Sequence, residues 1–315
     1  MQDSTVILIP AYNDWESLKV LVPNLQSALQ NVRGNYQFLI VDDGSTKKET
    51  ILSESNFQIN TLSLKRNVGH QKAIAIGMAY IHHTISCDKI LIMDSDGEDR
   101  PEDAATLLTT GQQQPGKIIF AHRSSRAEKF TFRFFYFFYK ILFRCLTGKR
   151  IAYGNFMILP KPLLDTLVYH NEIWNHLSAA IIKSNFDFIE VQTARGKRYT
   201  GRSNMSFTAL LLHGFGAISV FIEQMASRLL IISVALMFIS IVAICIILGV
   251  RWFTDLAIPG WASTVLLSML VVLLQSILIS LFTLFLFLSS QTNRKFIPVL
   301  HYTDYTGTEE KPVHE

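Results

Sequence analysis

The stretch Ile90-Leu91-Ile92-Met93-Asp94-Ser95-Asp96-Gly97-Glu98 decides the fold of this chain. Four apolar residues are followed at once by two carboxylates that lie one residue apart. We interpret the apolar run as a buried strand and Asp94-Ser95-Asp96 as the turn at its carboxyl end, where open α/β sheets bind ligands. Two carboxylates aimed at one point repel each other, and a divalent cation that also holds a phosphate relieves this repulsion. A polar turn without a ligand is the alternative, because Asp, Ser and Gly are common turn residues.

The chain before this stretch repeats the pattern of an apolar strand that ends in polar residues. Apolar runs predict strands at residues 5–10, 38–41 and 59–64. Apolar residues at helical spacing predict a helix over 18–29, and a second helix is expected over 73–82. Four alternations of strand and helix predict an α/β fold with a parallel, doubly wound sheet. The carboxyl ends of the first, second and fourth strands then bring together Tyr12, Asp42, Asp43, Asp94 and Asp96.

The C-terminal part of the chain is strongly apolar. Of the 315 residues 49% are hydrophobic, and the mean hydropathy is +0.27, which is high for a soluble protein. Residues 229–250 and 264–288 contain no charged side chain. At about 1.5 Å per residue, each would cross a hydrocarbon core of roughly 30 Å. We predict two transmembrane helices, and a buried helix hairpin of a large soluble protein is the alternative.

The flanking charges predict the orientation of these spans. Arg228, Arg294 and Lys295 lie on one side of the pair, whereas Arg251 lies between the spans. The positive-inside rule then places both termini in the cytoplasm of a multi-pass protein of the cell (inner) membrane. The first residues lack the basic start of a signal peptide, which agrees with this orientation. The three cysteines, one of them within a span, indicate reduced thiols rather than a disulfide framework.

Two further segments are predicted to lie on the membrane surface. Residues 130–147 are rich in aromatic side chains with scattered cations, which favours an interfacial helix on anionic lipid over a core helix. Residues 207–222 are apolar and lead into the first span. We therefore expect a cytoplasmic domain over 1–225, a membrane hairpin over 226–290 and a cytoplasmic tail over 291–315.

Basic residues gather in two loops. Lys65-Arg66-Asn67-Val68-Gly69 precedes a predicted helix, and cations with a glycine at a helix N-terminus suit a diphosphate; a solvated loop is the alternative. Residues 195–202 form the densest basic stretch, for which nucleic-acid binding is the generic interpretation. Because an acidic site and membrane spans accompany this stretch, we expect no nucleic acid. A loop that closes over a sugar-donor diphosphate or a lipid phosphate explains its charge better.

These residues resemble family 2 glycosyltransferases of the GT-A fold, and most of all the dolichyl-phosphate mannose synthase and polyprenyl-phosphate glycosyltransferase branch. The resemblance covers about residues 5 to 225 and implies a Rossmann-like, mainly parallel sheet followed by two transmembrane α-helices. The motifs that carry it are Ile9-Pro10-Ala11-Tyr12-Asn13-Asp14, Val41-Asp42-Asp43-Gly44-Ser45, Arg66-Asn67-Val68-Gly69, Met93-Asp94-Ser95-Asp96 and Arg198-Tyr199-Thr200-Gly201-Arg202-Ser203-Asn204-Met205.

The resemblance implies inverting transfer of a sugar from a UDP- or GDP-linked donor, with Mg²⁺ or Mn²⁺ on the diphosphate. By position, Pro10, Tyr12 and Asp14 would line the nucleotide pocket, and Asp42 would contact the base. The metal ligands would be Asp94, Asp96 and Glu98. The catalytic residues would be Asp94, Asp96, Arg123 and Arg198. The remaining expected contacts to the sugar donor or to phosphate are Asp43, Arg66, Asn67, Gly69, Arg126, Arg133, Arg202 and Ser203.

The acceptor is less constrained by the sequence. Relatives often carry Glu at position 14 and Gln at position 98, and here Phe156 lacks a following Arg and Asn204 replaces Lys. A polyprenyl phosphate is already ionised and needs no general base. A sugar hydroxyl on a lipid-linked glycan, as in polysaccharide biosynthesis, would need one, and Glu172 and Asp99 are the candidates. An inactive membrane scaffold is the third hypothesis, and a homo-oligomer stays open.

Overall fold

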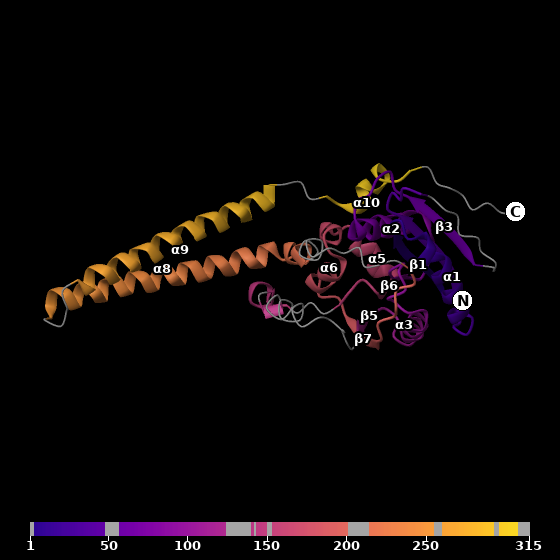
Figure 1. Cartoon of the computed structure of the whole chain (residues 1–315), viewed down its shortest axis with the longest axis horizontal. Helices are drawn as coiled ribbons and strands as arrows, with labels where there is room; N and C mark the ends of the chain where they lie inside the picture. Colours follow the sequence, from indigo (N-terminus) through magenta and orange to yellow (C-terminus); the bar gives the residue numbers. More distant parts are fainter. Residues whose placement is uncertain are drawn as a thin grey trace. The chain divides into compact units, whose positions relative to one another are not determined.

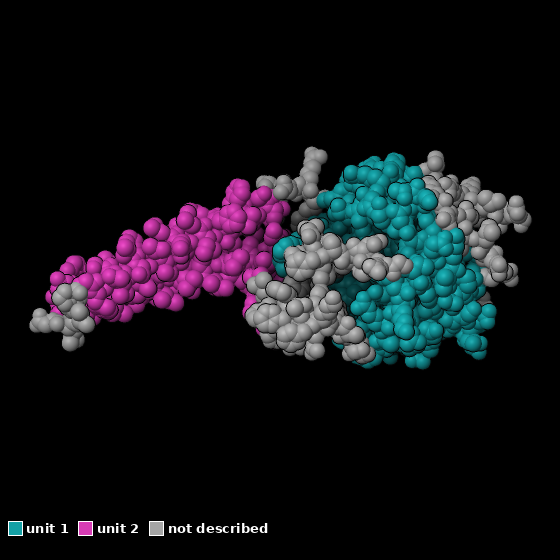
Figure 2. All heavy atoms as spheres, in the orientation of Figure 1, with its two compact units in different colours: residues 1–137, 150–220, 295–315 teal, residues 138–149, 221–294 magenta. Residues whose placement is uncertain are grey.

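The structure is a computed structural model of the whole chain. It describes residues 3–47, 57–123, 140–141, 143–149, 153–200, 214–254, 260–292 and 296–307. The chain divides into two compact units, which are coloured separately in Figure 2. The first unit comprises residues 1–137, 150–220 and 295–315, and the second comprises residues 138–149 and 221–294.

A mixed sheet forms the centre of the first unit. In the described residues it has seven strands in the order β3-β2-β1-β4-β6-β5-β7. The strands are β1 (Ser4–Ala11), β2 (Asn35–Asp42), β3 (Gln58–Ser63), β4 (Lys89–Ile92), β5 (Ile118–Arg123), β6 (Met157–Pro160) and β7 (Phe188–Thr193). β1, β2, β3 and β4 run parallel, and β7 runs parallel to β5. β6 runs antiparallel to both β4 and β5, so β5 points in the same direction as β4.

Helices cover both faces of this sheet (Figure 1). The helices of the first unit are α1 (Trp15–Leu29), α2 (His70–Thr84), α3 (Pro101–Gln113), α5 (Lys161–Leu167), α6 (Leu177–Lys183), α10 (Pro298–His301) and the short 3-10 helices η1 (Asn171–Trp174) and η2 (Tyr302–Asp304). The leucines of α1 at helical spacing are buried with α3 on one face. The apolar side chains of α2, α5 and α6 fill the core on the other face.

The predicted alternation of strands and helices is confirmed, with one strand missed. The first four strands lie where the apolar runs predict them, and β7 lies at one edge of the sheet. The sequence did not predict β6, because four apolar residues next to a proline carry no period that separates a strand from a helix. This strand makes the sheet mixed rather than wholly parallel.

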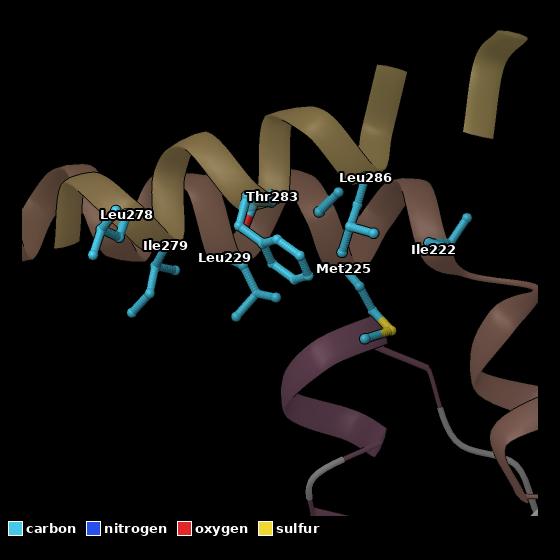
Figure 3. A pocket seen from close by; sticks show the side chains of 9 residues that line it. Ile222, Met225, Leu229, Leu278, Ile279, Thr283 and Leu286 are labelled. Carbon is cyan, nitrogen blue, oxygen red and sulfur yellow. The ribbon is translucent and has the colours of Figure 1, made fainter. Parts of the chain in front are cut away.

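The second unit contains two long apolar helices, α8 (Ile222–Phe253) and α9 (Trp261–Thr292), which pack along each other. Both are long and apolar enough to cross a membrane, and the predicted spans lie inside them. Ser233 Oγ lies 2.7 Å from Ser280 Oγ across the helix pair. A pocket of about 430 Å³ lies between the two helices. Figure 3 shows Met225, Leu229 and Thr283 among its lining residues.

The predicted interfacial segments are described only in part. Residues 130–139 and 207–213 lie outside the described residues, as do Arg126, Arg133, Arg202, Ser203 and Asn204. Residues 143–147 are helical and belong to the second unit. There the Phe143 ring contacts the Phe221 ring edge to face at 5.6 Å, and Arg228 Nη1 donates to the Cys145 carbonyl at 2.8 Å.

The chain returns to the first unit after α9. Leu64, which follows β3, forms an antiparallel bridge with Thr306. Lys65 N donates to the Tyr305 carbonyl at 2.9 Å, and Gly307 N donates to the Ser63 carbonyl at 2.9 Å. Residues 296–307, called here the C-terminal segment, are therefore attached to the edge strand of the sheet.

Candidate active site

The carboxyl ends of the parallel strands meet at one edge of the sheet, as predicted. The loop after β1 contacts the loop after β4, because Ser95 Oγ donates to Asp14 Oδ2 at 2.7 Å. The loop after β2 contacts the loop after β3, because Asp43 accepts hydrogen bonds from Val68 N and Gly69 N. Arg123 ends β5 at the same edge. Polar groups that follow five strands thus lie at one edge of the sheet.

Asp94 is held by its backbone on one side and by a histidine on the other. Asp94 N donates to Asp99 Oδ2 at 3.0 Å. Asp94 Oδ1 is buried and lies 3.2 Å from His70 Nε2, which forms an ion pair with it when the imidazole is protonated. Asn155 Nδ2 lies 3.1 Å from the same His70 nitrogen. His70 and Asn155 were not predicted; the one sequence signal was that His70 begins a helix at the acidic edge.

Asp99 joins the acidic turn to β5. Its side chain is only 1% exposed, and Oδ1 accepts a hydrogen bond from Arg123 Nη2 at 2.7 Å. Burial, reinforced by the neighbouring Asp94 charge, raises the pKa of Asp99 to about 7, while Arg123 opposes the shift. A carboxyl group so enclosed holds Arg123 and the Asp94 backbone in place.

Two arginines from the segment after β7 bind the acidic turn. Arg198 Nη2 lies 2.6 Å from Asp96 Oδ2. Arg195 binds Glu98 with two hydrogen bonds, from Nε at 3.1 Å and from Nη2 at 2.8 Å. Burial raises the pKa of Asp96, although the Glu98 backbone N–H and Arg198 oppose this. The predicted basic loop therefore lies on the Asp-Ser-Asp turn.

The backbone also attaches this basic segment to the acidic turn. Gly196 N donates to the Glu98 carbonyl at 2.8 Å, and Tyr199 N donates to the Asp96 carbonyl at 3.0 Å. Gly97 has a φ of +85°, and a Cβ placed there would lie 2.5 Å from the Tyr199 ring. Tyr199 therefore covers Gly97 closely, and only glycine fits both the backbone conformation and the space.

The end of β2 provides a buried carboxylate with one unused oxygen. Asp42 is fully buried, and Oδ1 accepts a hydrogen bond from Ser45 N at 3.0 Å. Its Oδ2 is buried and has no hydrogen-bond partner among the described residues. Such an atom is costly to leave unpaired, so it is available to accept a hydrogen bond from a ligand.

Asp43, by contrast, is used within the protein. Its two oxygens accept hydrogen bonds from Val68 N at 2.7 Å and Gly69 N at 2.9 Å. Burial raises its pKa, and these two backbone N–H groups oppose the shift. Asp43 therefore fixes the loop that carries Arg66 and Asn67, both of which are exposed.

The predicted residues near the nucleotide pocket lie around β1. Pro10 is buried at the end of this strand, and 46% of Tyr12 is exposed beyond it. Asn13 has a φ of 52°, and its Oδ1 accepts from Thr46 N at 2.9 Å, which links the loops after β1 and β2. Tyr12 is thus an exposed ring that follows β1 at the edge where the neighbouring strand β2 ends in Asp42.

The acidic turn fits a divalent cation that is shared with a diphosphate. Among the described residues, no three His, Cys, Asp or Glu side chains are arranged to hold a metal ion by themselves. Mg²⁺, however, is usually bound by one or two carboxylates together with substrate phosphates. Asp94 Oδ1 faces His70 Nε2 at 3.2 Å, and Asp96, two residues further on, has Oδ2 on Arg198 and Oδ1 on the Glu98 N–H, so a cation would replace some of these partners. Glu98, the third predicted ligand, has both oxygens on Arg195.

Comparison with known proteins identifies the family. The family model described as glycosyl transferase family 2 matches residues 6–167. The chain belongs to this family. It is 24% identical over 278 residues to the uncharacterized glycosyltransferase YkcC of Bacillus subtilis, a match that covers 84% of this chain and 82% of that protein.

A second relative is the undecaprenyl-phosphate 4-deoxy-4-formamido-L-arabinose transferase of Salmonella choleraesuis. It is 24% identical over 212 residues, which are 65% of this chain and 63% of that protein. The chain therefore spans just under two thirds of the length of this transferase.

Solved structures establish the fold of the glycosyltransferase. Mannosyl-3-phosphoglycerate synthase from Rubrobacter xylanophilus superposes with a TM-score of 0.51 at 11% identity over 72% of this chain and 75% of that one. Glucosyl-3-phosphoglycerate synthase from Mycobacterium tuberculosis, solved with Mn²⁺, UDP and phosphoglyceric acid, gives 0.51 at 13% identity over 71% of this chain and 78% of that one. The catalytic fold is thus GT-A.

Proposed function

We propose that this glycosyltransferase moves a sugar from a nucleotide sugar to a polyprenyl phosphate at the cytoplasmic face of the membrane. The observation that carries the proposal is one sheet edge with carboxylates at the strand ends, where Arg198 pairs with Asp96 and Arg123 pairs with Asp99, in a chain with two membrane-length apolar helices. Carboxylates for a cation and arginines for phosphates are the groups that such a transfer needs.

We place the sugar donor at the buried Asp42 oxygen that has no hydrogen-bond partner among the described residues. Asp42 Oδ2 would accept a hydrogen bond from an N–H of the base, and the exposed Tyr12 ring would pack on its face. Asp94 and Asp96 would hold Mg²⁺ or Mn²⁺ on the diphosphate. When bound, the cation neutralises charge on the leaving nucleoside diphosphate. Mn²⁺ and UDP bound to the mycobacterial relative support this assignment.

At the acceptor end of the site, the phosphate would be bound by arginine side chains. An oxygen of the ionised acceptor phosphate attacks the anomeric carbon while the bond from that carbon to the diphosphate oxygen breaks, and the configuration inverts. Arg123 and Arg198 would hold phosphate oxygens and stabilise the charge that moves between them. Arg198 is paired with Asp96 across 2.6 Å, so the binding of a cation by Asp96 would release its guanidinium for phosphate.

No base is needed for this acceptor, and the two candidate bases, Asp99 and Glu172, are both paired with cations. Asp99 is enclosed by Arg123 and the Asp94 backbone. Glu172 accepts a hydrogen bond from Lys183 Nζ at 2.8 Å, which lowers its pKa against the effect of burial. A sugar hydroxyl would need one of these carboxylates to be free. Their ion pairs favour the phosphate acceptor.

The second unit supports a lipid acceptor. The pocket between α8 and α9 is lined by Ile222, Met225, Leu229 and other apolar side chains, with Thr283 supplying a hydroxyl (Figure 3). The Salmonella relative is named for transfer to undecaprenyl phosphate. The C-terminal segment, which follows α9 in the chain, belongs to the catalytic unit through its bridge to Leu64. We place the catalytic unit in the cytoplasm by the positive-inside rule, from Arg228, Arg294 and Lys295.

The test is a transfer assay with the full chain in detergent. Labelled UDP- and GDP-sugars, Mn²⁺ and undecaprenyl phosphate are incubated with the protein, and the products are partitioned between water and organic solvent. Label in the organic phase that mild acid releases supports the proposal and names the sugar donor. Hydrolysis of the sugar donor without a lipid product would overturn it in favour of a glycan acceptor.

A further inference from the structure

The loop that carries Arg66 is held from two sides. On one side lie Asp43, which binds the Val68 and Gly69 N–H groups, and Gly44. Gly44 has a φ of +71°, and a Cβ there would lie 2.6 Å from the Arg66 carbonyl carbon. The loop therefore packs on the end of β2 without room for a side chain at position 44.

The other side of this loop contacts the C-terminal segment. The Lys65 N–H binds the Tyr305 carbonyl at 2.9 Å, and Lys65 Nζ donates to the Asp304 carbonyl at 3.1 Å. The Arg66 guanidinium carbon lies 6.0 Å from the centre of the Tyr305 ring, within the range of a cation–π contact.

Tyr305 is itself fixed by other aromatic rings. Its centroid lies 5.3 Å from that of Trp174 and 5.8 Å from that of Phe296, and Trp174 lies 4.1 Å from Phe296. Lys72 Nζ lies 5.3 Å from the Trp174 centroid. An aromatic cluster that includes two residues from beyond the membrane hairpin thus contacts two cations near the start of α2.

We propose that Tyr305 is a positioning residue for the sugar donor, because it holds the Arg66 side chain toward the diphosphate. The inference rests on the proposed function and on the expectation from the sequence that Arg66 contacts the donor diphosphate. An exposed arginine otherwise samples many rotamers, and ordering it on a ligand costs entropy. The Tyr305 ring limits these rotamers before the ligand arrives, so the chain that follows the membrane helices completes the site in the catalytic unit.

The experiment compares Tyr305→Leu with Tyr305→Phe in the full chain. The leucine variant removes the aromatic face, and we expect the KM for the sugar donor to rise about two- to fivefold, the size of an exposed cation–π contact, with kcat unchanged. Phenylalanine keeps the face and should restore the wild-type KM. Tyr302→Leu is the matched control, because the Tyr302 ring stacks on His83 at 5.4 Å, away from Arg66.

A double-mutant cycle separates positioning from general damage. With Arg66→Ala in place, adding Tyr305→Leu should raise the KM no further, because Tyr305 acts through Arg66. Tyr305→Met, which keeps more volume, is the second variant if the leucine variant unfolds early. An unchanged KM in the leucine and methionine variants, or effects that add to that of Arg66→Ala, would overturn the inference.

Failure of the proposed function gives a different result. If the wild type transfers no sugar to lipid, equilibrium dialysis with UDP and GDP measures nucleotide affinity directly. Weaker nucleotide binding by Tyr305→Leu, with normal binding by Tyr305→Phe, would then retain the positioning role and reject only the acceptor. Equal binding by all three proteins would reject the positioning role.

Discussion

Replacement of Gly97 by alanine tests how the basic segment is held on the acidic turn. Gly97 has a φ of +85° and faces the Tyr199 ring, whereas Gly116 has a φ of +84° and has no atom within 4 Å of a new Cβ. Both substitutions force an L-residue into the left-handed region, at about 1–2 kcal/mol each. Gly97→Ala also places its methyl group 2.5 Å from the ring. Gly116→Ala is therefore a control for backbone strain alone.

The short contact between the new methyl group at position 97 and the Tyr199 ring sets the expected loss of stability and turnover. Ordinary contact begins at 3.4 Å, so the ring must move by about 0.9 Å. Overpacking of this kind costs about 1–3 kcal/mol beyond the shared strain. Because Tyr199 follows Arg198 directly, the guanidinium moves too, and a 1 Å misplacement can reduce turnover by about a hundredfold. Gly116→Ala should keep wild-type turnover.

The assay combines sugar transfer with thermal unfolding in detergent. Gly97→Ala should melt below Gly116→Ala, by about 2–4 °C for each additional kcal/mol. The added variant Tyr199→Leu removes the ring, so Gly97→Ala in that background should cost no more stability than Gly116→Ala. Equal melting temperatures and equal turnover of the two alanine variants would refute the packing of Tyr199 on Gly97.

Four further outcomes are expected. Asp96→Ala should abolish sugar transfer without unfolding the protein, and normal turnover would contradict the metal assignment. Asp42→Asn, which keeps the shape but changes the partnerless oxygen, should weaken UDP or GDP binding in equilibrium dialysis by about tenfold or more. EDTA should stop transfer and Mn²⁺ should restore it, and activity in EDTA would count against a cation. Burial raises the pKa of Cys87 to about 11, so at pH 8 mass spectrometry should find maleimide on the exposed Cys145 and not on native Cys87.

The parts of the site that were predictable are those set by strand ends. Asp42, Asp94 and Asp96 each follow an apolar run, and parallel strands must bring such ends to one edge. The predicted basic loop at Arg198 also lies there, because opposite charges attract. Hydrophobic periodicity and charge are local properties of the chain, so both can be recognised from a single sequence.

The missed parts depend on contacts between distant segments. His70 and Asn155 are in contact although they lie 85 positions apart in the sequence. Arg66 and Tyr305 are in contact although the whole membrane hairpin separates them along the chain. Neither contact has a local pattern. Asp43 matched a ligand-binding pattern but binds the Val68 and Gly69 N–H groups, a choice that depends on loop geometry. Sequence reasoning identified which groups gather at the edge, but not which of them are already paired.

The bridge between Leu64 and Thr306 has a practical consequence. β3 is the last strand on its side of the sheet, and an uncovered edge strand pairs readily with other chains and leads to aggregation. Cutting the chain before α8 to obtain a water-soluble enzyme would uncover the carboxyl end of this edge strand. A soluble version should instead delete the hairpin and rejoin residues 296–307 through a glycine- and serine-rich linker, so that this end of the edge stays paired.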